Sequence, residues 1–210
     1  MSLLTTPLDQ ALSSRSKIRL LRVLIQQDRT VSARELARLT SMSGPAILAA
    51  LRDLAELGLI TRESSGRQFL CRANRAHMLV SSVLEPLFAA EAAWPAMLLA
   101  SVRDLVTLKS GQPVIAAWVF GSVATGQDEP GSDLDLFVLT QTDGERAAVA
   151  DHIAEAGAAW TRQFGPEVRP VVLTVEGAQA QLAAGSTFIQ EAVSQARLVA
   201  GEIPHELRRG

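Results

Sequence analysis

The 210-residue sequence contains a single cysteine, no tyrosine, and few aromatic residues, 4% in all. Because Cys71 has no second cysteine to pair with, an internal disulfide is excluded, and this usage is typical of a reducing compartment. The N-terminus lacks the apolar core of a signal peptide, and no apolar run approaches the roughly 20 residues of a membrane span. We therefore expect a cytoplasmic protein with a core of Leu, Val, Ile and Ala.

The sequence also has little net charge, −2, but its charges are unevenly distributed. Residues 1–75 contain 12 Arg and Lys against 6 Asp and Glu, whereas residues 76–210 contain 8 against 16. A basic first part and an acidic second part indicate two modules with different partners. The alternative is a single solvated surface on which charge is spread unevenly.

The basic part predicts three helices. Apolar residues recur at helical spacing over 14–27. Ser32 and Glu35 fit a capping box that begins a short second helix. Pro45 fits the first turn of a third helix, which stops at Gly58. The third helix is expected to bury its apolar residues at helical spacing, Ile47, Leu48, Leu51 and Leu54.

Two strand-like runs, 59–62 and 68–71, follow these helices and predict a hairpin. Three helices and a hairpin are the order of a winged helix-turn-helix. The stretch ELARLTSMSGPAILAALRDLAELGLITRESSGRQFLCR resembles winged-helix repressors of the arsenic-sensor type. The resemblance implies that residues 1–75 form a DNA-binding domain with one helix in the major groove of double-stranded DNA.

Several side chains of this module are candidates for contacts with DNA, most of them cations that neutralise phosphates. The candidates are Arg15, Lys17, Arg34, Arg38, Ser43, Arg52, Arg62 and Arg67. On the third helix only Arg52 has the geometry to contact guanine in a bidentate way. The alternative is a winged helix that serves dimerisation or protein contact alone.

Residues 76–95 predict a connecting helix, which Pro86 interrupts, and Pro95 is expected to open a separate helix over 96–109. By analogy with other winged-helix proteins, the connecting helix is a candidate dimer contact. A homodimer suits DNA half-sites that repeat about one helical turn apart. We expect a further domain over 96–201 and a polar, frayed tail over 202–210.

In the acidic part, a predicted buried strand over 114–120 runs into Gly121 and Ser122. Asp133 and Asp135 lie two residues apart at the start of a second strand, so both carboxylates project from one face. Two adjacent carboxylates repel each other unless a cation lies between them, which indicates a Mg²⁺ site. The Gly121 and Ser122 amides at a helix start suit phosphate oxygens.

The stretch FGSVATGQDEPGSDLDLFVL resembles the nucleotidyltransferases of the DNA polymerase beta superfamily, in their minimal, antitoxin-like branch. The matching positions are Gly121, Ser122, Ser132, Asp133 and Asp135. The resemblance implies that the glycine and serines bind a nucleoside triphosphate and that the paired Asp residues are catalytic and hold Mg²⁺. The alternative is an acidic turn that only caps a strand.

The sequence departs from this family at two positions. The family often has Arg where Thr125 stands, so a cation is missing on the phosphate side. The third catalytic carboxylate of the family is expected on a strand near residue 169, where this chain has Arg169. Glu167 lies two residues earlier on the same face and is a candidate substitute, whereas Arg169 would pair with Asp135 or attract phosphate.

Together these features predict an α+β protein, with an N-terminal winged helix-turn-helix and a C-terminal nucleotidyltransferase-type mixed sheet flanked by helices. The function expected first is a DNA-binding transcriptional regulator with a nucleotide- and Mg²⁺-binding domain that is catalytically degenerate. The second is an active nucleotidyltransferase that moves a nucleoside monophosphate to a hydroxyl of a protein or small molecule. The third is an antitoxin-type autorepressor.

Overall fold

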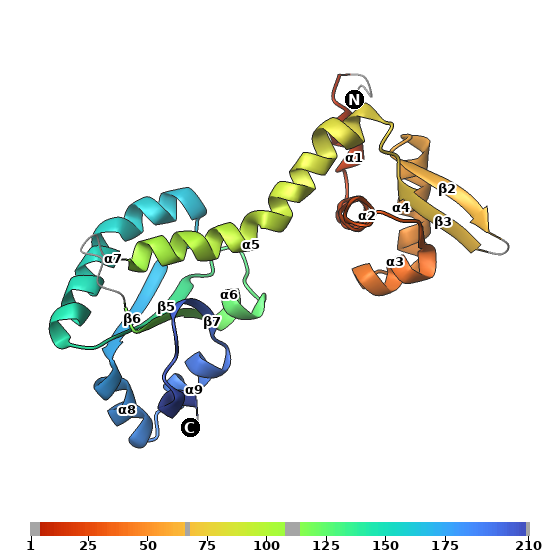
Figure 1. The fold of residues 1–210 in the computed structure, drawn as a ribbon. Coiled ribbons are helices and arrows are strands. Elements are labelled where there is room, and N and C mark those ends of the chain that lie inside the picture. The colour runs from red at the N-terminus through yellow and green to blue at the C-terminus, as the bar shows by residue number, and fades with distance from the viewer. Residues whose placement is uncertain (1–4, 66–67, 108–113, 209–210) are drawn as a thin grey trace. The chain divides into compact units, whose positions relative to one another are not determined.

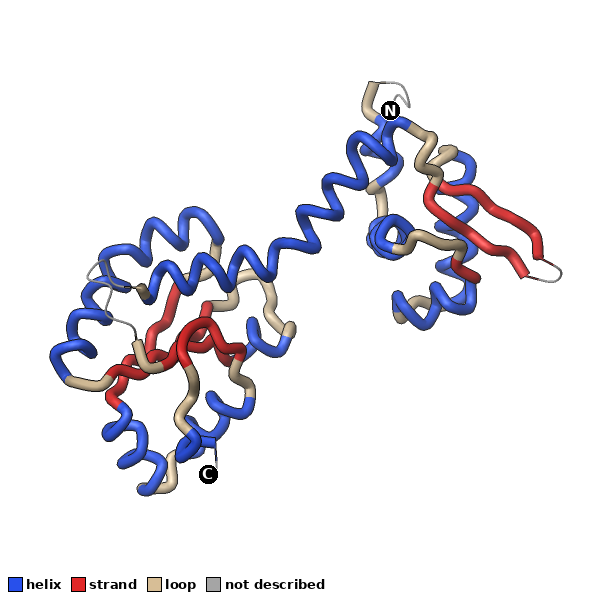
Figure 2. The backbone as a smooth tube through the Cα atoms, in the orientation of Figure 1, coloured by secondary structure: helices blue, strands red, loops and turns tan. Residues whose placement is uncertain are grey.

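The computed structural model describes residues 5–65, 68–107 and 114–208. The chain divides into two compact units, Met1–Trp94 and Pro95–Gly210, and each has its own buried core. Figure 1 shows the elements of both units along the chain, and Figure 2 distinguishes their helices, strands and loops.

The first unit is helical, with a small antiparallel sheet. Its elements are α1 (Pro7–Ala11), α2 (Arg15–Gln26), β1 (Val31–Ser32), α3 (Ala33–Thr40), α4 (Gly44–Glu56), β2 (Ile60–Ser65) and β3 (Gln68–Ala73). The strands are ordered β1-β3-β2, and β2 and β3 form the hairpin that the sequence predicts (Figure 2). The short strand β1 adds an unpredicted third strand through the pairing of Val31 with Cys71.

The helices α2, α3 and α4 begin at the expected residues, whereas α1 was not predicted. The capping box at the start of α3 is only half formed. The Glu35 amide donates a 3.2 Å hydrogen bond to Ser32 Oγ, as expected. The Glu35 carboxylate does not complete the box, because it accepts hydrogen bonds from the Arg29 guanidinium at 2.6 and 3.1 Å. This ion pair lowers the pKa of Glu35.

One predicted core residue of α4 lies on the surface. Ile47, Leu51 and Leu54 are buried, whereas Leu48 is 55% exposed. Leu48 follows Ile47 by one residue, or about 100° around the helix, and so leaves the stripe that faces the core. It instead shares the exposed side of α4 with Arg52.

A continuous helical segment follows the hairpin, where the sequence predicts two helices. A π-helical turn, η1 (Val80–Leu84), leads directly into α5 (Glu85–Val106), and Pro95 lies inside α5 and does not open a new helix. Together Val80–Val106 is long and apolar enough to cross a membrane by length and mean hydropathy, 1.3, and 11% of its most apolar stretch is buried. The expectation that no segment has this character is therefore wrong.

The second unit is a four-stranded sheet with helices on both faces. Its elements after α5 are β4 (Ala116–Phe120), α6 (Gly121–Thr125), β5 (Leu134–Thr140), α7 (Asp143–Phe164), β6 (Val168–Thr174), α8 (Val175–Ala183), α9 (Thr187–Ser194), β7 (Arg197–Gly201) and the 3₁₀ helix η2 (His205–Arg208). The strand order is β6-β5-β4-β7. Only β5 and β6 are parallel, which confirms the predicted mixed sheet.

Two apolar layers cover this sheet (Figure 1). On one face, Val119 and Leu136 pack in a cluster with Trp160 of α7. On the other face, Trp118 stacks on Phe137 with ring centroids 4.4 Å apart, and residues of α8, α9 and η2 complete the cluster.

Two residues near the end of the described chain belong to this second layer. Ile203 is 7% exposed and Leu207 is 2% exposed, and both are members of the cluster around Trp118 and Phe137. The frayed tail expected over 202–210 is therefore wrong for the described residues 202–208. Pro204, His205 and Glu206 separate Ile203 from Leu207. The polar composition of the segment therefore did not indicate that two apolar side chains in it are buried.

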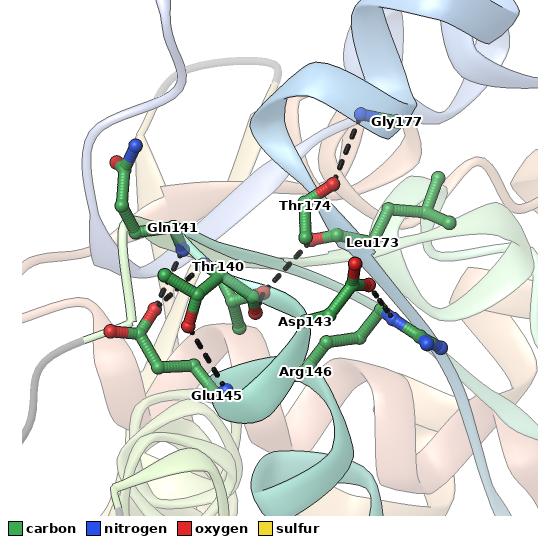
Figure 3. Close-up of polar contacts among 9 residues, drawn as sticks. Thr140, Gln141, Asp143, Glu145, Arg146, Leu173, Thr174 and Gly177 are labelled. Carbon is green, nitrogen blue, oxygen red and sulfur yellow. Dashed lines mark hydrogen bonds and ion pairs between the residues drawn. The ribbon is translucent and has the colours of Figure 1, made fainter.

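Side-chain caps fix the ends of the two parallel strands (Figure 3). Thr142 and Glu145 form a complete capping box at the start of α7. The Gly177 amide donates to Thr174 Oγ1 at 3.0 Å, and Thr140 Oγ1 donates to the Leu173 carbonyl at 3.4 Å. Of these bonds, the one from Thr140 to the Leu173 carbonyl links β5 and β6 at their carboxyl ends, and the uninterrupted pairing from there determines which residues meet at their amino ends.

Candidate functional site

The candidate site lies where β5 and β6 begin, beside the end of β4. Asp135 of β5 is paired with Phe120 of β4 and with Arg169 of β6. Paired residues of adjacent strands project from the same face of a sheet, and so does Asp133, two residues before Asp135. The register therefore brings two carboxylates and one guanidinium together on one face.

Arg169 forms an ion pair with the first of these carboxylates. Its Nη2 lies 2.8 Å from Asp133 Oδ2, and the side chains are 64% and 25% exposed. The sequence predicts that Arg169 pairs with Asp135 or attracts phosphate, whereas its ion pair in the structure is with Asp133, two residues before Asp135. Asp133 precedes the first residue of β5, and its carboxylate meets the long Arg169 side chain diagonally.

The second carboxylate, Asp135, has a raised pKa. Burial is the main cause, because desolvation disfavours the charged form, and the neighbouring Asp133 raises the pKa further, while Arg169 acts in the opposite direction. A nearby positive charge therefore favours the ionised form of Asp135.

Gly121 lies directly against Asp135. Its φ is +71°, and a Cβ built on Gly121 would lie 2.6 Å from Asp135 Oδ2. Glycine is therefore favoured by the backbone conformation, and a Cβ there would force the Asp135 carboxylate to shift. The Gly121 amide donates a 3.1 Å hydrogen bond to Gln195 Oε1, a partner that sequence reasoning missed because Gln195 follows α9, more than 70 residues later.

The hydroxyl groups of the motif have local partners. Thr125 Oγ1 donates to the carbonyls of Gly121 and Ser122 at 3.1 and 3.2 Å, so it closes the short helix α6. Ser132 Oγ accepts from the Glu129 amide at 2.9 Å, and this bond shapes the turn before Asp133. Of the predicted nucleotide-binding residues, Gly121 and Ser122 thus begin α6, and Ser132 lies in the loop directly before Asp133.

A pocket of about 540 Å³ adjoins Asp133. The loop 128–133, the loop 165–167 and Val123 line it. Its described lining contains the carboxylates of Asp128, Glu129, Asp133 and Glu167 but no Arg or Lys. A phosphate group in this pocket would meet only negative charge, so the pocket suits a neutral or cationic group.

The donor set at the site fits one divalent cation better than two. Mg²⁺ is commonly held by one or two carboxylates together with substrate phosphates and water, and Asp133 and Asp135 supply such a pair. Among the described residues no group of three His, Cys, Asp or Glu side chains is placed to hold a metal. Glu167, the expected substitute for the third acid, therefore does not join Asp133 and Asp135, and Arg169 lies at the third acid's expected place.

The candidate DNA-contacting side chains of the first unit are mostly exposed, with one clear exception. The exposed ones are Arg15, Arg34, Arg38, Ser43, Arg52 and Arg62. Lys17 is buried, pairs with Asp53 at 3.3 Å and donates to the Gln10 carbonyl and Ser13 Oγ. Its assignment as a phosphate contact is wrong, because its ammonium group is already held inside the fold.

Arg62 and Arg67 are the two candidate DNA-contacting residues near the hairpin tip. The Arg62 guanidinium lies over the ring of Phe69 at 4.7 Å, which orients it on the surface of the sheet. Arg67 lies outside the described residues.

Two family models match the chain, one for each unit. The MarR family model matches residues 14–68, and the model described as polymerase beta, nucleotidyltransferase, matches residues 106–199. The chain joins a winged helix-turn-helix domain to a nucleotidyltransferase domain. The predicted architecture of the two domains is thus confirmed.

Solved structures similar to the chain include two ArsR-type regulators. One, an ArsR-like transcriptional regulator from Rhodococcus sp. RHA1, is 26% identical, with a TM-score of 0.32, and the match covers 52% of this chain and 100% of that chain. The other, an ArsR family transcriptional regulator, is 20% identical, with a TM-score of 0.30, and covers 40% and 82%. Such TM-scores establish no fold on their own. No curated protein matches the chain.

The contact between Gly121 and Asp135 leads to a first prediction. Gly121→Ala should destabilise the protein by about 1–2 kcal/mol more than Gly126→Ala, since both glycines have positive φ but only Gly121 has the carboxylate against it. Chemical denaturation of the second unit measures the difference. Asp135→Ala should remove the excess cost; equal costs for the two glycine variants would contradict the close approach.

Proposed function

We propose that the protein is a DNA-binding transcriptional regulator of the cytoplasm whose nucleotidyltransferase-type domain binds a nucleoside triphosphate with Mg²⁺ and does not transfer it. The observation that carries the proposal is Arg169 in register with Asp135, at the place where the family resemblance requires a carboxylate. Two carboxylates can hold one cation, but the arginine supplies no base for an attacking hydroxyl.

The roles of the residues in nucleotide binding follow from their positions. When bound, Mg²⁺ would neutralise phosphate oxygens and bridge them to the protein. Asp133 and Asp135 would hold the ion, and the loop at Gly121 and Ser122 would approach the phosphates closely because Gly121 has no side chain. Gln195 occupies the Gly121 amide, so phosphate binding there requires Gln195 to move.

The DNA-binding role is supported by the exposed cations of α3 and α4. Arg34, Arg38 and Arg52 are exposed on the two helices that precede the hairpin, and they suit contacts with phosphates. The exposed Leu48 adds an apolar contact that suits the methyl group of thymine. An autorepressor of the antitoxin type would use the same surface.

The α5 helix supports a homodimer. Val83, Leu87, Ala90 and Trp94 follow one another at spacings of four, three and four residues, as in the contact seam of two paired helices, and all four are exposed. Over residues 86–102 the only charged residue is Glu91, which is bonded to Arg22 at 2.7 Å. We propose that a second copy covers this stripe in solution.

The helix α5 is not suited to span a membrane. Phe88 is buried in the core of the first unit and Val102 in the core of the second. Between them every residue over 89–97 is exposed, and this stretch extends about 14 Å at 1.5 Å per residue. The hydrocarbon layer is about 30 Å thick, so these residues are too few to span it.

An active nucleotidyltransferase is the second candidate function. The pocket beside Asp133, which Glu167 also lines, favours it, because an acceptor molecule there would lie next to the Asp pair. In such a reaction the acceptor hydroxyl would attack the α-phosphorus of the triphosphate, lose its proton and release pyrophosphate. A movement of Glu167 toward Asp133 and Asp135 would be required.

The regulator proposal predicts binding to duplex DNA that weakens steeply with salt. Arg34→Glu combined with Arg38→Glu should lower the affinity about tenfold or more on every sequence, and should lower the slope of log affinity against log salt by about 2. Fluorescence anisotropy at several salt concentrations measures both. Arg146→Glu, in the other unit, is the control; unchanged binding in the double variant would exclude this surface.

The nucleotide proposal predicts that Mg²⁺–ATP binds and that label from the α-phosphate of ATP is not transferred to the protein or to cell extract. Asp133→Ala with Asp135→Ala should abolish binding in isothermal calorimetry. Gln195→Ala should strengthen it about threefold, since the Gly121 amide no longer has a competing acceptor. Transfer of label that depends on Asp133 and Asp135 would establish the enzyme instead.

The dimer proposal predicts a mass of two chains by light scattering. Leu87→Glu should yield monomers, because two like charges would meet in the seam. Ala89→Glu puts the same charge on the same helix away from the stripe, and should remain dimeric. A monomeric wild type, or a dimer that tolerates Leu87→Glu, would refute the interface.

A further inference from the structure

A positively charged side chain, Arg169, lies beside the Asp133–Asp135 pair. The pair differs in this respect from a site that binds two metal ions. Arg169 Nη2 is 2.8 Å from Asp133 Oδ2, so a metal ion held by both carboxylates would share Asp133 with the guanidinium. One carboxylate oxygen cannot serve a guanidinium and a cation fully at the same time, since each needs its lone pairs.

The position of Arg169 is fixed by the sheet. The parallel pairing of β5 with β6 runs without interruption from Leu134 and Val168 to Thr140 and Thr174. The pairing places Arg169 beside Asp135 and within reach of Asp133. The arginine therefore lies at the carboxylate pair because of the fold, and no loop movement is needed to bring it there.

The charge of Arg169 also has the effect that a cation has on such a pair. Arg169 Nη2 lies 2.8 Å from Asp133 Oδ2, and Arg169 is paired across the sheet with Asp135. Two adjacent carboxylates repel each other, and a positive charge beside them reduces that repulsion.

We propose that the guanidinium of Arg169 replaces a metal ion at the Asp133–Asp135 pair, so that the site is assembled without metal and binds a single divalent cation weakly. The inference rests on the proposed function in that it concerns the same nucleotide site. It adds the reason why the site stays formed before any ligand arrives: the arginine is a built-in counterion, which an incoming cation must displace from Asp133.

The test measures binding of the metal alone, without nucleotide. Mn²⁺ binding to the full chain is followed by electron paramagnetic resonance of the free ion, with Mg²⁺ as competitor. Arg169→Gln should bind Mn²⁺ several-fold more tightly than the wild type, because Asp133 is released. Arg169→Glu should bind more tightly again, about 10- to 100-fold over the wild type, because it adds a third carboxylate.

A matched control is present in the same domain. Arg146 Nε bonds Asp143 Oδ1 at 2.9 Å (Figure 3), an exposed Arg–Asp pair at the opposite end of β5. Arg146→Gln releases a carboxylate in the same way and should leave Mn²⁺ binding unchanged. In Arg169→Glu, the further change Asp133→Asn should remove most of the gain.

The outcomes separate this inference from the proposed function. Equal Mn²⁺ affinity of the wild type, Arg169→Gln and Arg169→Glu would overturn the inference, even if Mg²⁺–ATP binds. A graded rise in Mn²⁺ affinity supports it, even if the wild type binds no ATP, and in that case only the proposed nucleotide function fails. Circular dichroism of each variant establishes that it is folded, and Arg169→Gln keeps the test valid if the charge reversal does not fold.

Discussion

The parallel pairing of β5 with β6 is the constraint on which the site depends. It aligns Asp135 with Arg169 through a pairing that runs without interruption from Leu134 and Val168 to Thr140 and Thr174. A shift of one residue would turn Arg169 to the opposite face of the sheet. The backbone register of β5 and β6 thus determines which charged side chains meet at the site.

Local patterns predicted much of the fold, because helix caps, apolar spacing and strand alternation act over a few residues. The helices that begin after Ser14 and Ser32, and the buried strand before Gly121, are of this kind. The strands β1 and β7 were missed because two to five residues carry too little pattern; they exist through pairing with β3 and β4. Pro95 was misread because the cores at both ends of α5 outweigh the cost of one missing helical hydrogen bond.

The candidate site was predicted in part. The motif spacing identified Gly121, Asp133 and Asp135, since these residues are close in sequence or on adjacent strands. It did not identify Gln195, which reaches the Gly121 amide from the far end of the domain, and it paired Arg169 with Asp135 although the ion pair is with Asp133. In the first unit, charge alone made Lys17 a candidate, but the partner Asp53 comes from another helix. These contacts join different helices and strands, and a periodic pattern in the sequence does not encode such contacts.

The place of β7 in the sheet has a consequence for synthesis of the protein on the ribosome. β7 is the neighbour of β4, and Gln195 and the buried Leu207 lie after α9, late in the second unit. The sheet edge and the Gly121 contact therefore cannot form until residues 195–201 have left the exit tunnel. The winged helix, complete by residue 94, is free to fold first, since domains generally fold as units during translation. A nascent chain can thus have the proposed DNA-contacting surface before it has the proposed nucleotide site.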